Sequence, residues 1–233
     1  MELNICHLYP DILNLYGDRG NVTCLKKRLE WRGIDCNVEG VSIGDKLEAS
    51  KYDLFFIGGG QDFEQGVLLQ DLSGEKTAEI KAAIEDEKVF LAICGGYQIL
   101  GSYYKTWDGQ QCDFLGALDL YTVGQKDRMI GNYMYECDDL GGQTVVGFEN
   151  HSGQTFLGDG VKPIGKVLSG YGNNGKDGYE GARYKNVYAT YSHGCLLPKN
   201  PAIADMLIRW ALERKYPGFQ LEPLADTLEN RAH

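Results

Sequence analysis

"FLAICGGYQILG" occupies residues 90–101, and this stretch decides how the chain is expected to fold. Its first half is an apolar run typical of a buried strand, and its second half has the spacing of a helix. Cys94 lies at the junction, with the small residues Ala92 and Gly96 two positions to either side. This combination fits a nucleophile elbow, a sharp strand-to-helix turn that presents a reactive side chain. A buried structural cysteine fits it too, because free cysteine is among the most buried residue types.

The chain before residue 105 alternates between strand-like and helix-like patterns. Apolar or alternating runs predict strands at 3–8, 36–43, 52–60 and 88–94, and amphipathic spacing predicts helices at 18–33, 75–86 and 96–104. Such alternation is typical of βαβ units around a parallel sheet.

After about residue 112 the alternation of strand-like and helix-like patterns gives way to strand-like runs. Strands are predicted at 118–124, 129–137, 144–151 and 185–193, and a closing helix at 201–216 with Pro201 in its first turn. Residues 169–182 are rich in glycine and have no periodicity, which predicts a long loop that is functional or mobile. Because nothing resembles a linker or a repeat, we expect one α/β domain over residues 1–233.

Composition excludes several classes of protein. The chain has 233 residues, 43% of them hydrophobic, and a formal net charge of -10, which makes a nucleic acid an unfavourable partner. No apolar stretch is long enough for a membrane span, and the N-terminus lacks the pattern of a signal peptide. The seven cysteines are irregularly spaced without a C-x-x-C pair, so we expect neither disulfides nor a metal site, and a cytoplasmic location.

A second glycine-rich turn follows the apolar strand in "FFIGGGQD", residues 55–62. In a parallel sheet this turn opens at the same carboxyl edge as Cys94, where ligands bind. Glycines at 58–60 let backbone amides approach a substrate closely. A phosphate-binding loop is the rival interpretation, but neither G-K-[ST] nor G-x-G-x-x-G is present. An ordinary tight turn is the third.

A nucleophilic thiol needs a base, and the sequence has four histidines. His7 lies in the first strand, and His233 is the last residue. His193 ends an alternating strand just before a glycine, which suits a side chain that points into a cleft. A histidine there is more often structural, but its pairing with an elbow cysteine favours a general base.

Four short motifs in this order resemble those of class I glutamine amidotransferases of the cobyric acid synthase-like (CobB/CobQ-like) branch: "GGGQD" (58–62), "AICGGYQILG" (92–101), "GFENHSG" (147–153) and "YSHG" (191–194). The resemblance covers nearly the whole chain. It implies a flavodoxin-like α/β fold and the hydrolysis of L-glutamine to glutamate and ammonia.

Longer stretches are similar to the small glutaminase subunits of lipid II isoglutaminyl synthases: "LYPDILNLYGDRGN" (8–21), "GYGNNGKDGYEG" (170–181) and "HGCLLPKNP" (193–201). This likeness implies a heterodimer with a Mur-ligase-like partner that uses ATP and Mg²⁺ to amidate the D-glutamate of the peptidoglycan stem peptide. No cofactor is then expected on this chain. Two alternatives stay open, a subunit for cobyrinate-type amidation and a catalytically silent binding module.

The resemblance also assigns roles to single residues. It makes Cys94 the nucleophile and His193 the base, with the amides of Gly60 and Gly95 as oxyanion donors. Gln98 corresponds to a position that contacts bound glutamine.

Further positions line the expected pocket. Gly59, Glu149 and His151 are expected to shape it rather than to carry chemistry. Arg128 is the best candidate for gripping the α-carboxylate of glutamine, since a guanidinium group can hold a carboxylate with two hydrogen bonds. A solvated charge in a turn is the alternative for Arg128.

The sequence departs from the family pattern after His193. Many class I amidotransferases have H-x-E there, with the acid of the triad, whereas this chain has "HGC" and Cys195. No acid is near in sequence, so a carboxylate from the partner is expected to complete the triad. The narrower group usually has proline at this position; Cys195 is expected to serve packing, and Cys195→Pro to retain much of the activity.

Overall fold

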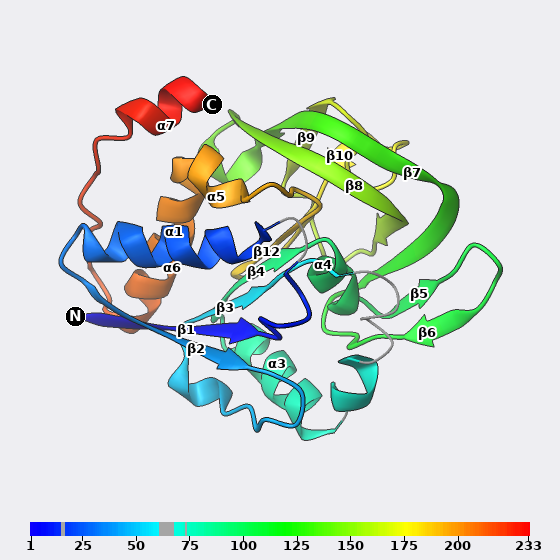
Figure 1. Ribbon diagram of the computed structural model, residues 1–233, viewed down its shortest axis with the longest axis horizontal. Helices are drawn as coiled ribbons and strands as arrows, with labels where there is room; N and C mark the ends of the chain where they lie inside the picture. Colours follow the sequence, from blue (N-terminus) through cyan, green and yellow to red (C-terminus); the bar gives the residue numbers. More distant parts are fainter. Residues whose placement is uncertain (15–16, 61–67, 73) are drawn as a thin grey trace.

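The computed structural model describes residues 1–14, 17–60, 68–72 and 74–233, and it is built on two six-stranded sheets (Figure 1). Gln61 and Asp62 of the "GGGQD" motif lie outside the described residues. None of the helices in the described ranges is long and apolar enough to cross a membrane. All seven cysteines are free thiols.

The first sheet has the strand order β11-β12-β4-β3-β1-β2. Its strands are β1 (Glu2–Leu8), β2 (Asp35–Val41), β3 (Leu54–Ile57), β4 (Val89–Ile93), β11 (Ala182–Tyr184) and β12 (Val187–Thr190). All neighbouring pairs are parallel except β11 with β12. The parallel arrangement brings the carboxyl ends of β1, β3, β4 and β12 to one edge, as the alternating sequence predicts.

Two connections run in opposite directions from the centre of this sheet. The chain passes from β1 through α1 (Arg19–Glu30) to β2, and from β3 through α3 (Glu75–Glu85) to β4. Because parallel crossovers are right-handed, the two helices cover opposite faces, and Figure 1 shows α1 and α3 on the two sides of the strands. The order reverses between β1 and β3, which makes their carboxyl ends a switch point where ligands bind.

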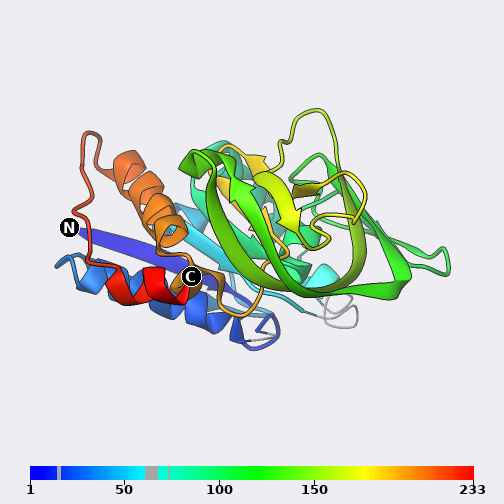
Figure 2. The same cartoon turned by 90° about the horizontal axis from the view of Figure 1, so that it is seen from above.

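The second sheet lies beside the first and curves over it (Figure 2). It has the order β10-β9-β7-β5-β6, with β8 paired to β7. Its strands are β5 (Tyr103–Lys105), β6 (Gln111–Asp113), β7 (Leu120–Cys137), β8 (Gln143–Leu157), β9 (Gly165–Ser169) and β10 (Tyr179–Glu180). The β7–β8 hairpin dominates this sheet, and its register shifts at a bulge between Gly124 and Met129.

The remaining helices are short or close the chain. They are η2 (Ala49–Lys51), α4 (Gly95–Ile99), η3 (Asp138–Leu140), α5 (Leu196–Lys199), α6 (Pro201–Lys215) and α7 (Thr227–Ala232). α1 packs against α5 and α6. The predicted closing helix is confirmed as α6, which begins at Pro201.

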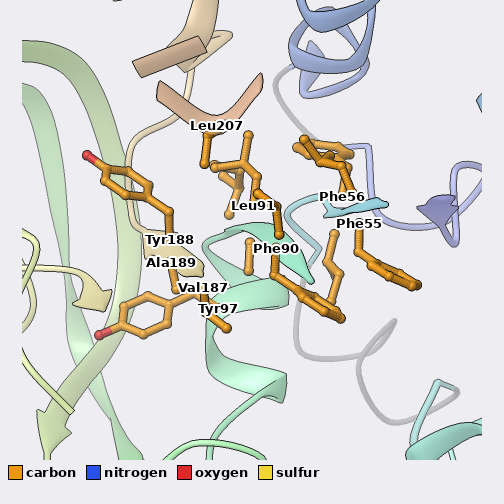
Figure 3. Close-up of a cluster of buried hydrophobic side chains, with 14 of the residues drawn as sticks. Phe55, Phe56, Phe90, Leu91, Tyr97, Val187, Tyr188, Ala189 and Leu207 are labelled. Atoms are coloured by element: carbon orange, nitrogen blue, oxygen red, sulfur yellow. The ribbon is translucent and has the colours of Figure 1, made fainter. Parts of the chain in front are cut away.

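The core of the first sheet is apolar on both faces, because every residue of β3, β4 and β12 is buried. Phe55 stacks on Phe90 with ring centroids 4.5 Å apart, and Leu91 and Leu207 belong to the same cluster (Figure 3). Burying a side chain of this size stabilises the fold by about 1.5–3 kcal/mol.

Three local predictions need correction. The helix predicted at 96–104 ends at Ile99, and Tyr103–Lys105 form β5. A Cβ at Gly101 would lie 2.8 Å from the backbone oxygen of Leu120, so the chain turns there against β7. The strands predicted at 118–124 and 129–137 are one strand, β7. The segment 169–182 is not a free loop, because it contains β10 and the start of β11.

Candidate active site

Cys94 occupies a strained turn between β4 and α4. Its φ of 49° and ψ of -103° are rarely adopted by residues other than glycine, and such strain is typical of functional sites. The backbone N–H of Cys94 donates to the carbonyl oxygen of Thr190 at 2.8 Å, which ties the turn to the end of β12. A Cβ at Gly96 would lie 2.7 Å from the carbonyl oxygen of Ile57, so the turn has room only for glycine. The local geometry is that of a nucleophile elbow.

His193 lies beside this cysteine and is fully buried. Its backbone N–H donates to the carbonyl oxygen of Phe148 at 2.7 Å, so β8 holds the residue in place. Burial alone would lower the pKa of His193, but the charge of Cys94 and hydrogen bonds to Asp18 and Cys94 raise it above the usual 6.5. The surroundings of His193 therefore favour its protonated, imidazolium form.

Asp18, directly before α1, is the acidic partner of His193. Its Oδ1 lies 3.5 Å from Nδ1 of His193, and both side chains are fully buried. Its Oδ2 accepts a hydrogen bond of 2.7 Å from the backbone N–H of Gly59. The chain therefore places an acid beside His193 although none is near it in sequence: this acid stands 175 residues before the histidine, and a carboxylate from the partner stays a prediction.

The three glycines after β3 approach the same centre. A Cβ at Gly59 would lie 2.7 Å from Cε1 of His193 and 3.5 Å from Cβ of Cys94, so a side chain would displace the histidine. The amide of Gly59 is engaged by Asp18, and that of Gly96 by the carbonyl oxygen of Gly58 at 3.1 Å. Among the described residues, no acceptor takes the amides of Gly60 and Gly95. They are the two amides at this turn that an oxyanion could use.

Gln98 lies one turn after Cys94 in α4 and is buried. Its Nε2 donates to the hydroxyl group of Tyr191 at 3.0 Å. That hydroxyl group also shares a hydrogen bond of 2.6 Å with Oγ1 of Thr155. The side-chain amide of Gln98 is therefore oriented by Tyr191, which follows β12 of the first sheet, and through it by Thr155 in β8.

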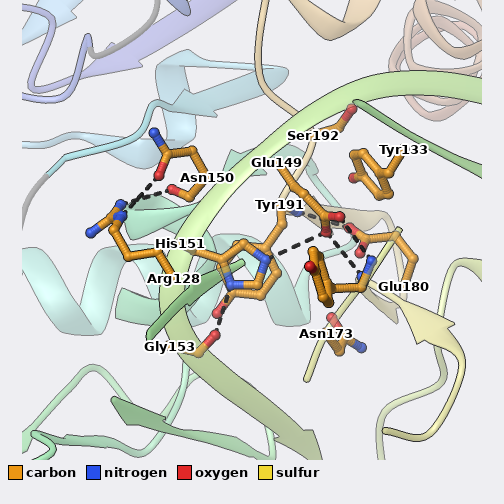
Figure 4. A network of polar contacts seen from close by, with 12 residues as sticks. Arg128, Tyr133, Glu149, Asn150, His151, Gly153, Asn173, Glu180, Tyr191 and Ser192 are labelled. Carbon is orange, nitrogen blue, oxygen red and sulfur yellow. Dashed lines mark hydrogen bonds and ion pairs between the residues drawn. The ribbon is translucent and has the colours of Figure 1, made fainter. Parts of the chain in front are cut away.

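Arg128 lies in the bulge of β7 and is exposed. Figure 4 shows its side chain next to Asn150. Its Nε donates to Oδ1 of Asn150 at 2.9 Å, and its Nη2 to the carbonyl oxygen of Asn150 at 3.1 Å. Because Asn150 belongs to the "GFENHSG" motif, Arg128 is fixed to the predicted pocket segment.

Glu149 and His151 point into the interior from β8 (Figure 4). The carboxylate of Glu149 accepts from the backbone N–H groups of Tyr171 and Gly172 at 2.8 and 3.0 Å. The ring of His151 stacks on Tyr191 at 3.6 Å between centroids, and burial lowers the pKa of this histidine. These contacts hold both side chains in the interior, and their role in shaping the pocket stays a prediction.

The described residues contain no group of three or more His, Cys, Asp or Glu side chains that could hold a metal ion. Cys195 also lies near the site, where its thiol donates to the carbonyl oxygen of Gly17 at 2.9 Å. Burial raises the pKa of the Cys195 thiol, which disfavours the reactive thiolate.

Asp18 was missed because it lies far from His193 in sequence. The signal in the sequence was the motif "LYPDILNLYGDRGN", which contains Asp18 but to which no role in catalysis had been assigned.

A strained cysteine, a buried histidine and glycine amides at the carboxyl edge of a parallel sheet are the arrangement that the resemblance to class I glutamine amidotransferases implies. Residues 4–201 match the CobB/CobQ-like glutamine amidotransferase domain, and the chain belongs to this family. Its fold is flavodoxin-like, as the sequence predicted. PurLQS from Thermotoga maritima has a similar fold, with a TM-score of 0.62 at 17% identity over 91% of this chain and 99% of that chain.

Two relatives are much more similar in sequence. The lipid II isoglutaminyl synthase (glutamine-hydrolyzing) subunit GatD of Staphylococcus aureus (strain N315) is 46% identical over 95% of this chain and 88% of its own length. The subunit of the same name from Streptococcus pneumoniae (strain ATCC BAA-255 / R6) is 44% identical over 92% of this chain and 82% of its own length.

Proposed function

We propose that this chain is the glutamine-hydrolysing subunit of a lipid II isoglutaminyl synthase. The observation that carries the chemistry is the strained Cys94 beside the buried pair of His193 and Asp18. The similarity to two GatD subunits along almost the whole chain supports the narrower assignment.

The reaction begins when His193 takes the proton of the Cys94 thiol. The thiolate attacks the carboxamide carbon of glutamine, and the amides of Gly60 and Gly95 hold the oxyanion. One such donor contributes roughly 3 kcal/mol in acyl-transfer sites. His193 then gives its proton to the departing ammonia, which leaves a glutamyl thioester on Cys94. Water activated by His193 hydrolyses the thioester to glutamate and restores the thiol.

Two side chains bind the substrate, one from β7 and one from α4. Arg128 grips the α-carboxylate of glutamine with its guanidinium group. Gln98 contacts the substrate from α4, because Tyr191 orients its side-chain amide.

Asp18 orients the ring of His193 and stabilises the imidazolium ion. The distance of 3.5 Å between Oδ1 of Asp18 and Nδ1 of His193 is longer than the roughly 2.7–2.9 Å of a strong charge-assisted hydrogen bond. The isolated chain is therefore expected to be a weak glutaminase.

The ammonia serves a partner. A Mur-ligase-like subunit forms a cytoplasmic heterodimer with this chain and uses ATP and Mg²⁺ to amidate the D-glutamate of the peptidoglycan stem peptide. No cofactor is assigned to this chain.

The proposal is tested with Cys94→Ser, which barely changes side-chain volume. Glutamate release should fall to background while the melting temperature stays within a few degrees of the wild type. Amidation of lipid II by the reconstituted pair should then depend on added ammonium. Turnover of glutamine by the folded variant would refute the thioester mechanism. Failure of the pair to amidate lipid II, with glutaminase activity intact, would refute the assigned acceptor.

A further inference from the structure

The glycine-rich segment 169–182 is held firmly at several points, although its composition suggests mobility. Glu149 accepts hydrogen bonds from the backbone of Tyr171 and Gly172. The side chain of Asn173 donates to the carbonyl oxygen of Gly181 at 2.9 Å and accepts from its N–H at 2.8 Å. These contacts fold the segment back on itself and accompany the burial of Glu180 in β10, whose neighbour Tyr179 is exposed.

Glu180 is fully buried and contacts the end of β12 (Figure 4). Its Oε1 accepts hydrogen bonds from Oγ1 of Thr190 at 2.7 Å and from the backbone N–H of Tyr191 at 2.8 Å. Oγ1 of Thr190 in turn accepts from the backbone N–H of Ser192 at 3.0 Å. One carboxyl group thus organises three successive residues that lead directly to His193.

Thr190 connects the same group to the nucleophile. Its side chain donates to Glu180, while its carbonyl oxygen accepts the hydrogen bond from the backbone N–H of Cys94 at 2.8 Å. On the far side, the backbone of His193 is held by Phe148. The distance between the base and the nucleophile therefore depends on two anchors, β8 after His193 and Glu180 before it.

A carboxyl group is a costly choice for this position if packing is its only task. Its Oε2 has no hydrogen-bond partner among the described residues, and burial raises the pKa of Glu180 to about 7. Apolar residues of similar volume usually stabilise such a site better than a buried ionisable group does. The cost is explained if two directed hydrogen bonds to 190–191 are needed for the reaction.

We propose that Glu180 is a positioning residue: it joins the glycine-rich segment to residues 190–192 and thereby sets His193 against Cys94. This inference rests on the proposed glutaminase activity. Glu180 acts through the backbone that carries the base, without touching the reacting atoms.

The experiment compares Glu180→Ala and Glu180→Gln in the full chain. The alanine variant loses both acceptors, so kcat for glutamine hydrolysis should fall at least tenfold while KM changes less than threefold. The rate of Cys94 alkylation by iodoacetamide at pH 7 should fall as well, because His193 no longer assists ionisation of the thiol. The glutamine variant retains an acceptor oxygen of the same shape and should restore kcat to within about threefold.

Asn174→Ala is the matched control. Asn174 is buried in the same segment and makes hydrogen bonds to Thr155, Lys176 and Asp177, but none to the backbone of 190–193. It meets only the backbone oxygen of Thr155, whereas the hydroxyl group of Thr155 contacts the side chain of Tyr191. We expect it to lower the melting temperature and to change kcat less than twofold. Equal kcat values for Glu180→Ala and Asn174→Ala, measured below both melting transitions, would overturn the proposal.

If Glu180→Ala does not fold, Thr190→Val cuts the same hydrogen bond from the other side with little change of shape. It should show the same loss of kcat at nearly constant KM, and wild-type kcat in this variant would overturn the proposal. Labelling of wild-type Cys94 by a diazoketone analogue of glutamine separates failure of the glutaminase assignment from failure of the role proposed for Glu180. An unlabelled, inactive wild type refutes the glutaminase assignment, whereas an active wild type with equally active Glu180 variants refutes only the role of Glu180.

Discussion

At the scale of single residues, the site depends on a buried carboxylate with two tasks. Asp18 faces His193 with one oxygen and holds the backbone of Gly59 with the other. It therefore links the base to the glycine turn that supplies Gly60. A carboxylate that orients the histidine also stabilises the imidazolium ion during catalysis.

We predict that Asp18→Asn lowers kcat for glutamine hydrolysis about a hundredfold or more. The amide cannot stabilise the imidazolium ion, and loss of such an acid costs up to about 10⁴ in a serine protease. KM should change little, because Asp18 does not contact the substrate. Glutamate release and thermal unfolding are measured together, with Asp11→Asn on the exposed surface as the control. An unchanged kcat would show that another carboxylate orients His193.

Arg128→Lys tests the α-carboxylate clamp. Lysine keeps the charge but loses the two-pronged geometry, so kcat/KM should fall by a factor corresponding to about 1.5–3 kcal/mol. Lysine also cannot reproduce both contacts with Asn150. Kinetics with glutamine and with a glutamine analogue that lacks the α-carboxylate separate a direct clamp on that carboxylate from indirect support of the segment around Asn150. An equal loss for both compounds would mean that Arg128 only supports the segment around Asn150.

At the scale of elements, backbone geometry revises one expectation about Cys195. This residue begins the turn into α5 with a φ of 52°, whereas proline is confined to about -65°. Its thiol also fills the space against Gly17 and Gly20. Proline is therefore incompatible with this turn, although the narrower family usually has it.

Cys195→Pro should accordingly lower both stability and glutaminase activity by displacing His193, two residues away. Cys195→Gly, which accepts a positive φ, should retain more activity than the proline variant. Circular dichroism melting and glutamate release check the order of the variants. Full activity of Cys195→Pro would show that the turn can adopt another conformation.

The buried end of β10 predicts a pH dependence of stability. Burial raises the pKa of Glu180 from 4.5 to about 7, with Glu149 adding a further rise and Thr190 and the Tyr191 backbone opposing it. Between pH 4.5 and about pH 7, the carboxyl group of Glu180 keeps its proton in the folded state but has released it in the unfolded chain. The contribution of Glu180 to stability is therefore greatest below pH 4.5 and is lost as pH rises toward 7, at up to about 1.4 kcal/mol per pH unit.

Denaturant unfolding of the wild type and Glu180→Gln from pH 5 to pH 8 measures this effect. As pH rises toward about 7, the free energy of unfolding of the wild type should fall relative to that of Glu180→Gln, and above pH 7 the difference should level off. A difference independent of pH would mean that Glu180 titrates with its ordinary pKa.

At the scale of the whole molecule, the two sheets meet at the site: the first supplies Cys94, and β8 of the second holds His193. A docked partner can act on this junction in two ways. It can press α1 toward β12 and shorten the contact of Asp18 with His193, or it can contribute a carboxylate of its own.

We predict a large gain in glutamate production when the Mur-ligase-like partner is added at saturating glutamine. If docking shortens the contact, Asp18→Asn removes the gain. If the partner supplies the acid, changing one of its interface carboxylates to the amide removes the gain and Asp18→Asn does not. Equal rates with and without the partner would mean that Asp18 alone completes the triad.

The sequence by itself determined the parallel sheet and the elbow at Cys94, and it predicted a histidine at the end of a strand. That strand, β12, ends at Thr190, three residues before His193. These features follow from local patterns: apolar runs, alternation, and small residues where the backbone turns sharply. The early end of α4 was not visible in this way, because Gly101 turns against β7, which is distant along the chain until the sheets pack.

Only the tertiary structure decided the partners of the buried charged groups. Asp18 and His193 are separated by 175 residues, and they meet because β1, β3, β4 and β12 end at one edge. The burial of Glu180 depends in the same way on the folding of segment 169–182 over β12. A carboxylate has the same identity in any sequence context, and its pKa and its role are set by the neighbours that the fold brings to it.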